Sequence, residues 1–156
     1  MKLFIQVAIG LMVLMFSTIA SWYEGSTLTQ DILEWEHTAV FSKWFNGSVN
    51  QTNDILTIDY FIYAAKFAPA YPLAMLLSGT YLLILIGYML CRGKTKQFSY
   101  FLSFVGIVFL ILCNLVSDSP TTGLTMFFYS SLFIGILMMG IAMILIVTTK
   151  RKQIIT

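Results

Sequence analysis

Charged residues are scarce in this sequence, and their scarcity excludes most classes of soluble protein. Only 10% of its 156 residues are Asp, Glu, Lys or Arg, whereas 58% are hydrophobic. A soluble domain usually has about 25% charged residues. The chain therefore lacks the polar surface that a protein needs in water, and its apolar residues require another environment.

Cysteine and histidine are also rare, which excludes several kinds of chemistry. Cys91 and Cys113 are too few for a disulfide framework, and they fall near opposite ends of separate apolar runs. The sequence contains no zinc-binding spacing, no phosphate-binding glycine loop and no nucleophile elbow. We therefore expect a protein that is not an enzyme, binds no cofactor and has no nucleic acid as its partner.

What the sequence has in abundance is long apolar runs, at residues 3–21, 71–91, 98–116 and 124–147. About 20 apolar residues in a helix cross a hydrocarbon core of about 30 Å, where the backbone must satisfy its own hydrogen bonds. We predict an all-α membrane protein in which residues 1–156 form one domain, a bundle of four transmembrane helices. Residues 22–70 hold the predicted extracytoplasmic loop, a partly helical connection of roughly 45 residues between spans one and two.

The first apolar run also has the pattern of a secretory signal peptide. A basic start at Lys2, an apolar core from Leu3 to Phe16 and the small residue Ala20 would suit cleavage after Ala20. The run is long for a signal core, however, and Trp22 follows it as an interfacial anchor. We predict a retained span, with cleavage as the alternative; in both cases the residues that follow Ser21 lie on the extracytoplasmic side.

Basic and acidic residues fall on opposite sides of the membrane when the four predicted spans are placed in it. This distribution predicts the orientation of the chain. Seven basic residues lie on one side, and all seven acidic residues lie on the other with only Lys43 and Lys66. Because cytoplasmic loops are enriched in Lys and Arg, we predict a multi-pass plasma-membrane protein with both termini in the cytoplasm. The seven basic residues are Lys2, Arg92, Lys94, Lys96, Lys150, Arg151 and Lys152.

The predicted outer loop contains two candidate helical segments. Residues 26–45 favour a surface helix or two helical turns, with Thr29 as a candidate N-cap. Thr57 is a candidate N-cap of a second helix, with Asp59 in its first turn. The apolar spacing of this helix is typical of an amphipathic helix on the outer membrane face, and Pro69 and Pro72 predict a bend after it.

Aromatic residues are unusually frequent in this loop. Disordered linkers have few aromatic residues, so we predict a compact cap on the outer ends of the spans. Some of the rings could instead serve as interfacial anchors. The aromatic residues are Trp22, Tyr23, Trp35, Phe41, Trp44, Phe45, Tyr60, Phe61 and Tyr63.

Glu34 and His37 form a Glu-x-x-His spacing, which places a carboxylate and an imidazole on one side of a helix. Di-iron bundles use this spacing, but in two copies with further carboxylates. A single copy in an external loop is more typical of a solvated acidic surface. We therefore predict no metal site and keep Glu34 and His37 only as candidate ligands.

The predicted spans contain small and hydroxyl residues at helical spacing but no ionisable residue deep within them. Proton-coupled transporters usually keep an ionisable group in the bilayer. Small residues on one face allow helices to approach closely, so helix packing explains these stripes best. A substrate path is the alternative, and its candidate residues are Ser103, Asn114 and Ser131.

Three segments carry a resemblance to a known family: Phe16–Ser26 (FSTIASWYEGS), Asp59–Phe67 (DYFIYAAKF) and Pro72–Gly79 (PLAMLLSG). Over nearly its whole length the chain resembles small uncharacterised four-span membrane proteins of Bacillus-type bacteria. That family has no assigned activity, and the resemblance implies a plasma-membrane location. The topology is also similar to that of claudins, but the outer loop lacks their cysteine pair.

Three functional hypotheses follow, and the third is a metal-dependent envelope enzyme that would use Glu34 and His37. The first is a non-enzymatic envelope protein that acts through its outer loop, by contact with another membrane protein or with a second copy of itself. Trp35 and Trp44 are the candidate contact residues of this hypothesis. The alternative is a small channel or an accessory subunit of a transporter, which would use Ser103, Asn114 and Ser131.

Overall fold

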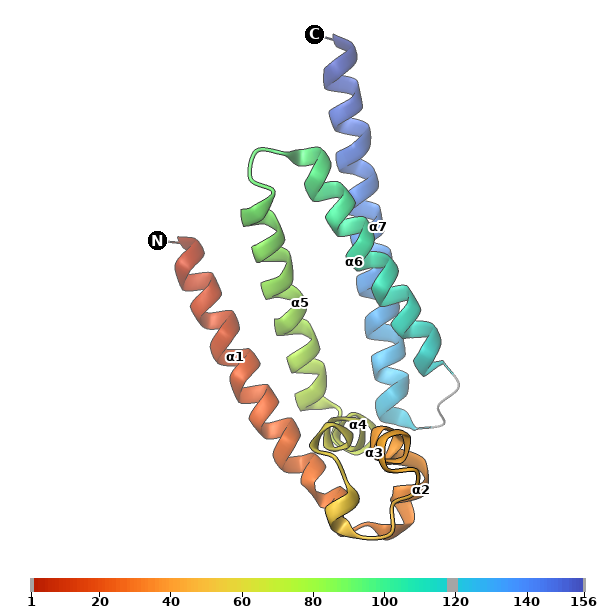
Figure 1. The fold of residues 1–156 in the computed structure, drawn as a ribbon. Helices are drawn as coiled ribbons and strands as arrows, with labels where there is room; N and C mark the ends of the chain where they lie inside the picture. The colour runs from red at the N-terminus through yellow and green to blue at the C-terminus, as the bar shows by residue number, and fades with distance from the viewer. Residues whose placement is uncertain (1, 118–120, 156) are drawn as a thin grey trace. The chain divides into compact units, whose positions relative to one another are not determined.

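The computed structural model describes the backbone of residues 2–117 and 121–155 and the side chains of residues 3–117 and 121–151. The described residues are helical throughout their regular structure, with no β-strand (Figure 1). The long helices are α1 (Lys2–Gly25), α5 (Ala70–Leu90), α6 (Thr95–Val116) and α7 (Thr122–Ile155). Between α1 and α5 lie η1 (Ser26–Thr29), η2 (Ile32–Glu34), α2 (Trp35–Thr38), α3 (Val40–Asn46), η3 (Thr52–Asp54) and α4 (Thr57–Phe67).

Four helices are long and apolar enough to cross a membrane, within Leu3–Thr29, Ala70–Leu90, Thr95–Val116 and Thr122–Arg151. The prediction of an all-α chain with four long apolar helices is confirmed. Helix α1 continues past the predicted end at residue 21 to Gly25, and serine hydroxyls along it bond back to the preceding turn. Ser21 Oγ, for example, donates to the carbonyl oxygen of Ser17 at 2.7 Å.

The number of helices and the N-cap residues predicted for the segment between α1 and α5 are wrong. Residues 26–46 form four short helices and not one or two. The Thr29 hydroxyl donates to the Ser26 carbonyl oxygen, so Thr29 closes η1 and caps no following helix. Thr57 is the first residue of α4, and Leu56 stands at the N-cap without a side-chain bond. The bend predicted at the prolines is confirmed, since α4 ends at Phe67 and α5 begins at Ala70.

The chain divides into two compact units. Unit 1 comprises Met1–Gly79 and Thr121–Leu124, and unit 2 comprises Thr80–Pro120 and Thr125–Thr156. In unit 1, α4 packs across the C-terminal end of α1. Gly25 makes this crossing possible, because a Cβ at that position would overlap the backbone of Tyr60. Beside them is a small core of Leu28, Trp35 and Ile55, against which Val49, Tyr60 and Tyr63 pack.

In unit 2, α6 and α7 approach closely at a pair of glycines. A Cβ on Gly135 would lie 2.9 Å from the Leu110 side chain, and a Cβ on Gly106 would lie 3.2 Å from the Gly135 carbonyl oxygen. Small residues at this point allow the two helices to approach closely. The buried side chains around the glycines are almost all apolar: Leu102, Val105, Phe109, Cys113, Ile134, Met138 and Ala142.

Candidate functional site: the cap between α1 and α5

The segment 26–67, which we call the cap, is built around a buried carboxylate. Asp59, in the first turn of α4, is fully buried and faces the N-terminus of α3. Its Oδ1 accepts the backbone N–H of Phe41 at 3.0 Å, and its Oδ2 accepts the backbone N–H of Ser42 at 2.8 Å. These are donors that a helix N-terminus leaves without an intrahelical partner. A side chain of α4 therefore caps α3, which lies beside it (Figure 1).

Ser42 extends this contact to the chain that precedes α4. The Ser42 hydroxyl donates to Asp59 Oδ2 at 2.5 Å and accepts the backbone N–H of Leu56 at 2.7 Å. A carboxylate acceptor makes the bonds to Asp59 shorter and stronger than bonds between neutral groups. Since an unpaired buried polar group costs about 1–3 kcal/mol, the completeness of this network matters more than any single bond. The network fixes α3 relative to α4.

A second polar contact joins α2 to α4. Lys66 Nζ donates to Thr38 Oγ1 at 2.7 Å and to the His37 carbonyl oxygen at 3.0 Å, and it lies 3.7 Å from Glu34 Oε2. Thr38 Oγ1 in turn donates to Glu34 Oε2 at 2.9 Å. The carboxylate of Glu34, a candidate metal ligand, is thus engaged by a cation and a hydroxyl. His37 contributes its backbone carbonyl, and the described residues include no cluster of three or more metal-binding side chains.

The two candidate contact tryptophans have opposite environments. Trp35 is only 8% exposed, and its indole Nε1 donates to the Leu28 carbonyl oxygen at 2.8 Å. Trp44 is 77% exposed and meets Phe45 edge-to-face, with ring centroids 5.0 Å apart. Trp35 therefore belongs to the core of the cap, and Trp44 is available for contact.

Helix α3 carries an apolar surface that the sequence pattern did not reveal. Val40, Phe41, Trp44 and Phe45 are all exposed, and their i, i+1, i+4 and i+5 spacing places them on one side of the helix. We call these four residues the α3 aromatic face. On the opposite side of the helix, Ser42 is buried against Asp59. The polar network thus faces inward, and the large apolar side chains face outward.

Tyr63 on α4 has a raised pKa. Burial is the largest cause, and the nearby carboxylates of Asp31 and Glu34 add to it, while a hydrogen bond with Thr27 acts against it. The Tyr63 hydroxyl donates to Asp31 Oδ2 at 3.3 Å, a bond that also favours the neutral phenol. The titration of this tyrosine therefore reports on whether the cap is folded.

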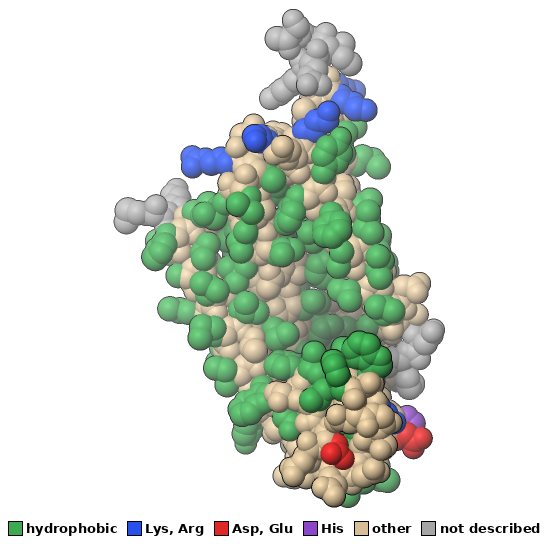
Figure 2. All heavy atoms as spheres, in the orientation of Figure 1, with side chains coloured by type: hydrophobic (Ala, Val, Ile, Leu, Met, Phe, Trp, Pro, Cys, Tyr) green, Lys and Arg blue, Asp and Glu red, His purple; other side chains and the backbone are tan. Residues whose placement is uncertain are grey.

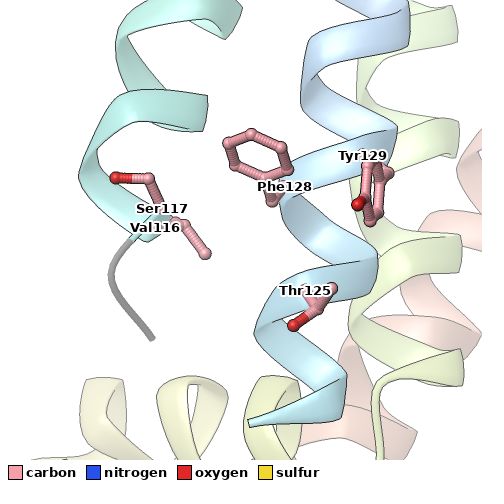
Figure 3. A pocket seen from close by; sticks show the side chains of 5 residues that line it. All are labelled: Val116, Ser117, Thr125, Phe128 and Tyr129. Atoms are coloured by element: carbon pink, nitrogen blue, oxygen red, sulfur yellow. The ribbon is translucent and has the colours of Figure 1, made fainter. Parts of the chain in front are cut away.

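The candidate path residues of unit 2 lie in different surroundings. Ser131 on α7 is buried, Ser103 on α6 is partly exposed, and Asn114 is exposed near the end of α6. A cavity of about 190 Å³ in unit 2 is lined by Val116, Ser117, Thr125, Phe128 and Tyr129 (Figure 3). Phe128 points from α7 toward α6 there, and the Ser117 hydroxyl points away and donates to the Asn114 carbonyl oxygen at 2.8 Å. None of the three candidate side chains lines this cavity.

A second cavity of about 190 Å³ lies in unit 2 at the turn between α5 and α6. It is lined by Tyr88, Cys91, Gly93, Thr95, Phe98 and Leu145. Basic side chains gather around the same end of unit 2 (Figure 2). The described residues of this unit include no acidic side chain, so all the charged side chains among them are basic.

Sequence reasoning missed the contact between Asp59 and Ser42 and the contact between Lys66 and Thr38. The partners are 17 and 28 residues apart, so no local pattern could reveal them. One signal was present: Lys43 and Lys66 were the two basic residues that departed from the predicted orientation pattern. Both bind backbone carbonyl oxygens of the cap, Lys43 that of Glu36 and Lys66 that of His37.

Comparison with known proteins places the chain in a family. A family described as "Domain of unknown function (DUF4306)" matches residues 4–91. The chain is also similar to "Uncharacterized protein YjdJ" of Bacillus subtilis (strain 168), with 37% identity over 97 residues that make up 61% of this chain and 89% of that protein. No solved structure matches the chain. The chain therefore belongs to the DUF4306 family, in agreement with the resemblance to uncharacterised proteins of Bacillus-type bacteria.

Proposed function

We propose that this member of the DUF4306 family is a multi-pass plasma-membrane protein that acts by contact, through the α3 aromatic face, with another membrane protein. The four long apolar helices support the membrane location. The basic residues at the α5–α6 turn and at the end of α7 support cytoplasmic termini and an extracytoplasmic cap.

The observation that carries this proposal is the contrast between the two sides of α3. Its inner side is held by the buried Asp59 network, and its outer side leaves four large apolar side chains exposed. Such clusters mark interaction surfaces, where tryptophan and phenylalanine are enriched. A rigid support lowers the entropy lost on binding, so a preorganised aromatic cluster suits recognition.

The position of α3 favours a partner at the membrane surface. Helix α3 packs on α4, and α4 packs on the end of α1. With a helix diameter of about 10 Å, the α3 aromatic face stays within about 20 Å of the end of that span. A partner must therefore reach this level, as the outer parts of a neighbouring membrane protein do.

The test is co-purification from native membranes after chemical crosslinking, read by mass spectrometry. In the double variant W44A/F45A we expect at least a tenfold loss of the crosslinked partner, since central aromatic side chains dominate interface energies. The matched control is I32A/L33A, which removes two other exposed apolar side chains of the cap. The control should retain the partner.

Two results would overturn the proposal. If W44A/F45A retains the same partner as the unaltered chain, the α3 aromatic face is not the contact. If crosslinking recovers no protein partner and residue 44 contacts only lipid, the α3 aromatic face is a membrane anchor. Recovery of a second copy of this chain through α3 would identify the partner as the chain itself.

The channel alternative has less support. The contacts between α6 and α7 centre on glycines and apolar side chains, and Asn114 lies outside them. Reconstituted flux that depends on Ser103, Asn114 and Ser131 would favour this alternative over the contact role.

A further inference from the structure

We infer that the cavity at the α5–α6 turn binds an anionic phospholipid, with the phosphate at the basic turn and the start of an acyl chain in the cavity. This inference rests on the membrane location proposed above. It concerns unit 2 and does not depend on the cap.

The lining of the cavity suits a hydrocarbon chain next to a polar group. Tyr88, Phe98 and Leu145 supply apolar surface, and the rings of Tyr88 and Phe98 meet edge-to-face with centroids 5.8 Å apart. Thr95 adds a hydroxyl at the turn itself. The lining therefore changes from apolar to polar, as a lipid does where its chain joins the glycerol.

The size of the cavity decides which part of a lipid fits. An apolar protein cavity of about 150 Å³ is known to hold benzene. At about 190 Å³, this cavity accommodates a short stretch of acyl chain but no complete lipid. The rest of the lipid would stay in the bilayer beside α5 and α6.

Charge complementarity selects the headgroup. Arg92 and Lys94 lie in the turn beside the lining residues Cys91 and Gly93, Lys96 lies in the first turn of α6, and all three are exposed. Lys150 and Arg151 on α7 follow the lining residue Leu145 by five and six residues, more than one helical turn beyond the cavity. Because the described part of unit 2 has no carboxylate to neutralise the cations of the α5–α6 turn, an anionic headgroup is the complementary partner.

Positive charge alone would also serve to orient the chain in the membrane. Orientation requires no cavity, however, and it does not depend on lipid binding at a defined place. The experiment must therefore separate the cavity from the charge.

The first experiment uses the unaltered chain in detergent and follows alkylation of Cys91, which lines the cavity, beside that of buried Cys113. We expect phosphatidylglycerol to slow the alkylation of Cys91 at least tenfold more than phosphatidylcholine with the same acyl chains, and Cys113 to remain unreactive. Equal protection by the two lipids, or no protection, would overturn the inference.

The second experiment measures phosphatidylglycerol bound to each variant by native mass spectrometry. Each basic side chain near an anionic group contributes about fivefold in affinity, so R92Q/K94Q should lose about twentyfold or more. The matched variant K150Q/R151Q has the same net charge as R92Q/K94Q, and its affinity for phosphatidylglycerol should fall far less. C91F fills the cavity without changing any charge, and it should also lose the bound lipid.

Retention of phosphatidylglycerol by C91F would mean that charge alone attracts the lipid, and the inference would be wrong. Circular dichroism of each variant checks that it stays helical, and the alkylation experiment needs no variant. Resistance of the chain to alkaline extraction from membranes is measured separately. A chain that resists extraction but shows no lipid preference contradicts only this inference, whereas an extracted chain contradicts the proposed membrane location as well.

Discussion

The internal contacts that stabilise unit 1 differ in kind from those that stabilise unit 2. In unit 1, the cap depends on polar groups that are buried and fully paired, such as Asp59 and Ser42. In unit 2, α6 and α7 pack through the glycines at 106 and 135 and through apolar side chains. The difference shows how a chain with few charges uses them: polar contacts fix the short helices of the cap, whereas the long helices need only close packing.

The family match takes in most of unit 1 and the first 12 residues of unit 2. It covers residues 4–91, which hold α1, the whole cap and α5, and α6 and α7 lie beyond it. The relative from Bacillus subtilis is the shorter chain, since the same aligned residues make up a larger share of it. We therefore regard the cap as the part in which the function of the family is to be sought.

The sharpest way to break the cap is to remove Trp35. Trp35→Ala should lower the stability of the cap by about 3–5 kcal/mol, because it leaves a cavity in a small core and frees the Leu28 carbonyl oxygen. Trp44→Ala should change that stability by less than about 0.5 kcal/mol. Limited proteolysis of the cap in micelles measures both variants. Equal sensitivity of the two would contradict the assignment of Trp35 to the core.

The next largest effect is expected at Asp59. Asp59→Asn should cost about 2–3 kcal/mol, because an amide has one acceptor oxygen for the three donors that the carboxylate binds. Hydrogen exchange at the amides of Phe41 and Ser42 should accelerate. Asp54→Asn is the control, since Asp54 also accepts two backbone N–H groups but at an exposed site. If D54N is as damaging as D59N, burial is not what makes the Asp59 network important.

A third variant should affect unit 2 and leave the cap unchanged. Gly135→Leu should destabilise the packing of α6 on α7 by about 1–3 kcal/mol, because the new side chain meets Leu110 and the Gly106 backbone. Gly140→Leu is the matched control, since nothing lies within 4 Å of a Cβ there. Thermal unfolding in detergent measures the packing, and hydrogen exchange monitors the cap. Loss of cap protection in G135L would show that the units do not respond separately.

The smallest effect concerns pH. The pKa of Tyr63 is raised above 10.0 in the folded cap, so the folded state binds the phenolic proton more tightly than the unfolded state. The contribution of Tyr63 to stability is therefore fully present below pH 10.0 and is lost as the pH rises through the higher folded value. Phenolate absorbance and cap proteolysis over this alkaline range should show the loss. Tyr63→Phe should remove this part of the pH dependence, and an unchanged profile would contradict the assignment.

The long helices could be predicted from the sequence, and most of the cap could not. Apolar runs at 71–91 and 98–116 identify α5 and α6 within three residues, because length and hydropathy alone determine them. The short helices of the cap depend on tertiary contacts. Asp59 was expected to serve the helix that contains it, but its carboxylate caps α3 instead. Local sequence propensity cannot predict which helix the Asp59 carboxylate caps, because its hydrogen-bond partner Ser42 is 17 residues away.

The same limit applies to the candidate site. The sequence identified Trp35 and Trp44 as equivalent candidates, because both are tryptophans in one aromatic-rich segment. Only the packing around Leu28 separates the buried ring from the exposed one. The Glu-x-x-His spacing at Glu34 likewise gave no indication of Lys66, which binds it from α4.

Site-specific photocrosslinking in native membranes can determine whether the α3 aromatic face contacts another membrane protein. A photoreactive phenylalanine derivative replaces Trp44 on the α3 aromatic face in one variant and Leu33, which is 87% exposed elsewhere on the cap, in another. We expect position 44 to crosslink to one membrane protein and position 33 to crosslink to none. Equal crosslinking at both positions, or crosslinking to lipid alone at position 44, would contradict this expectation.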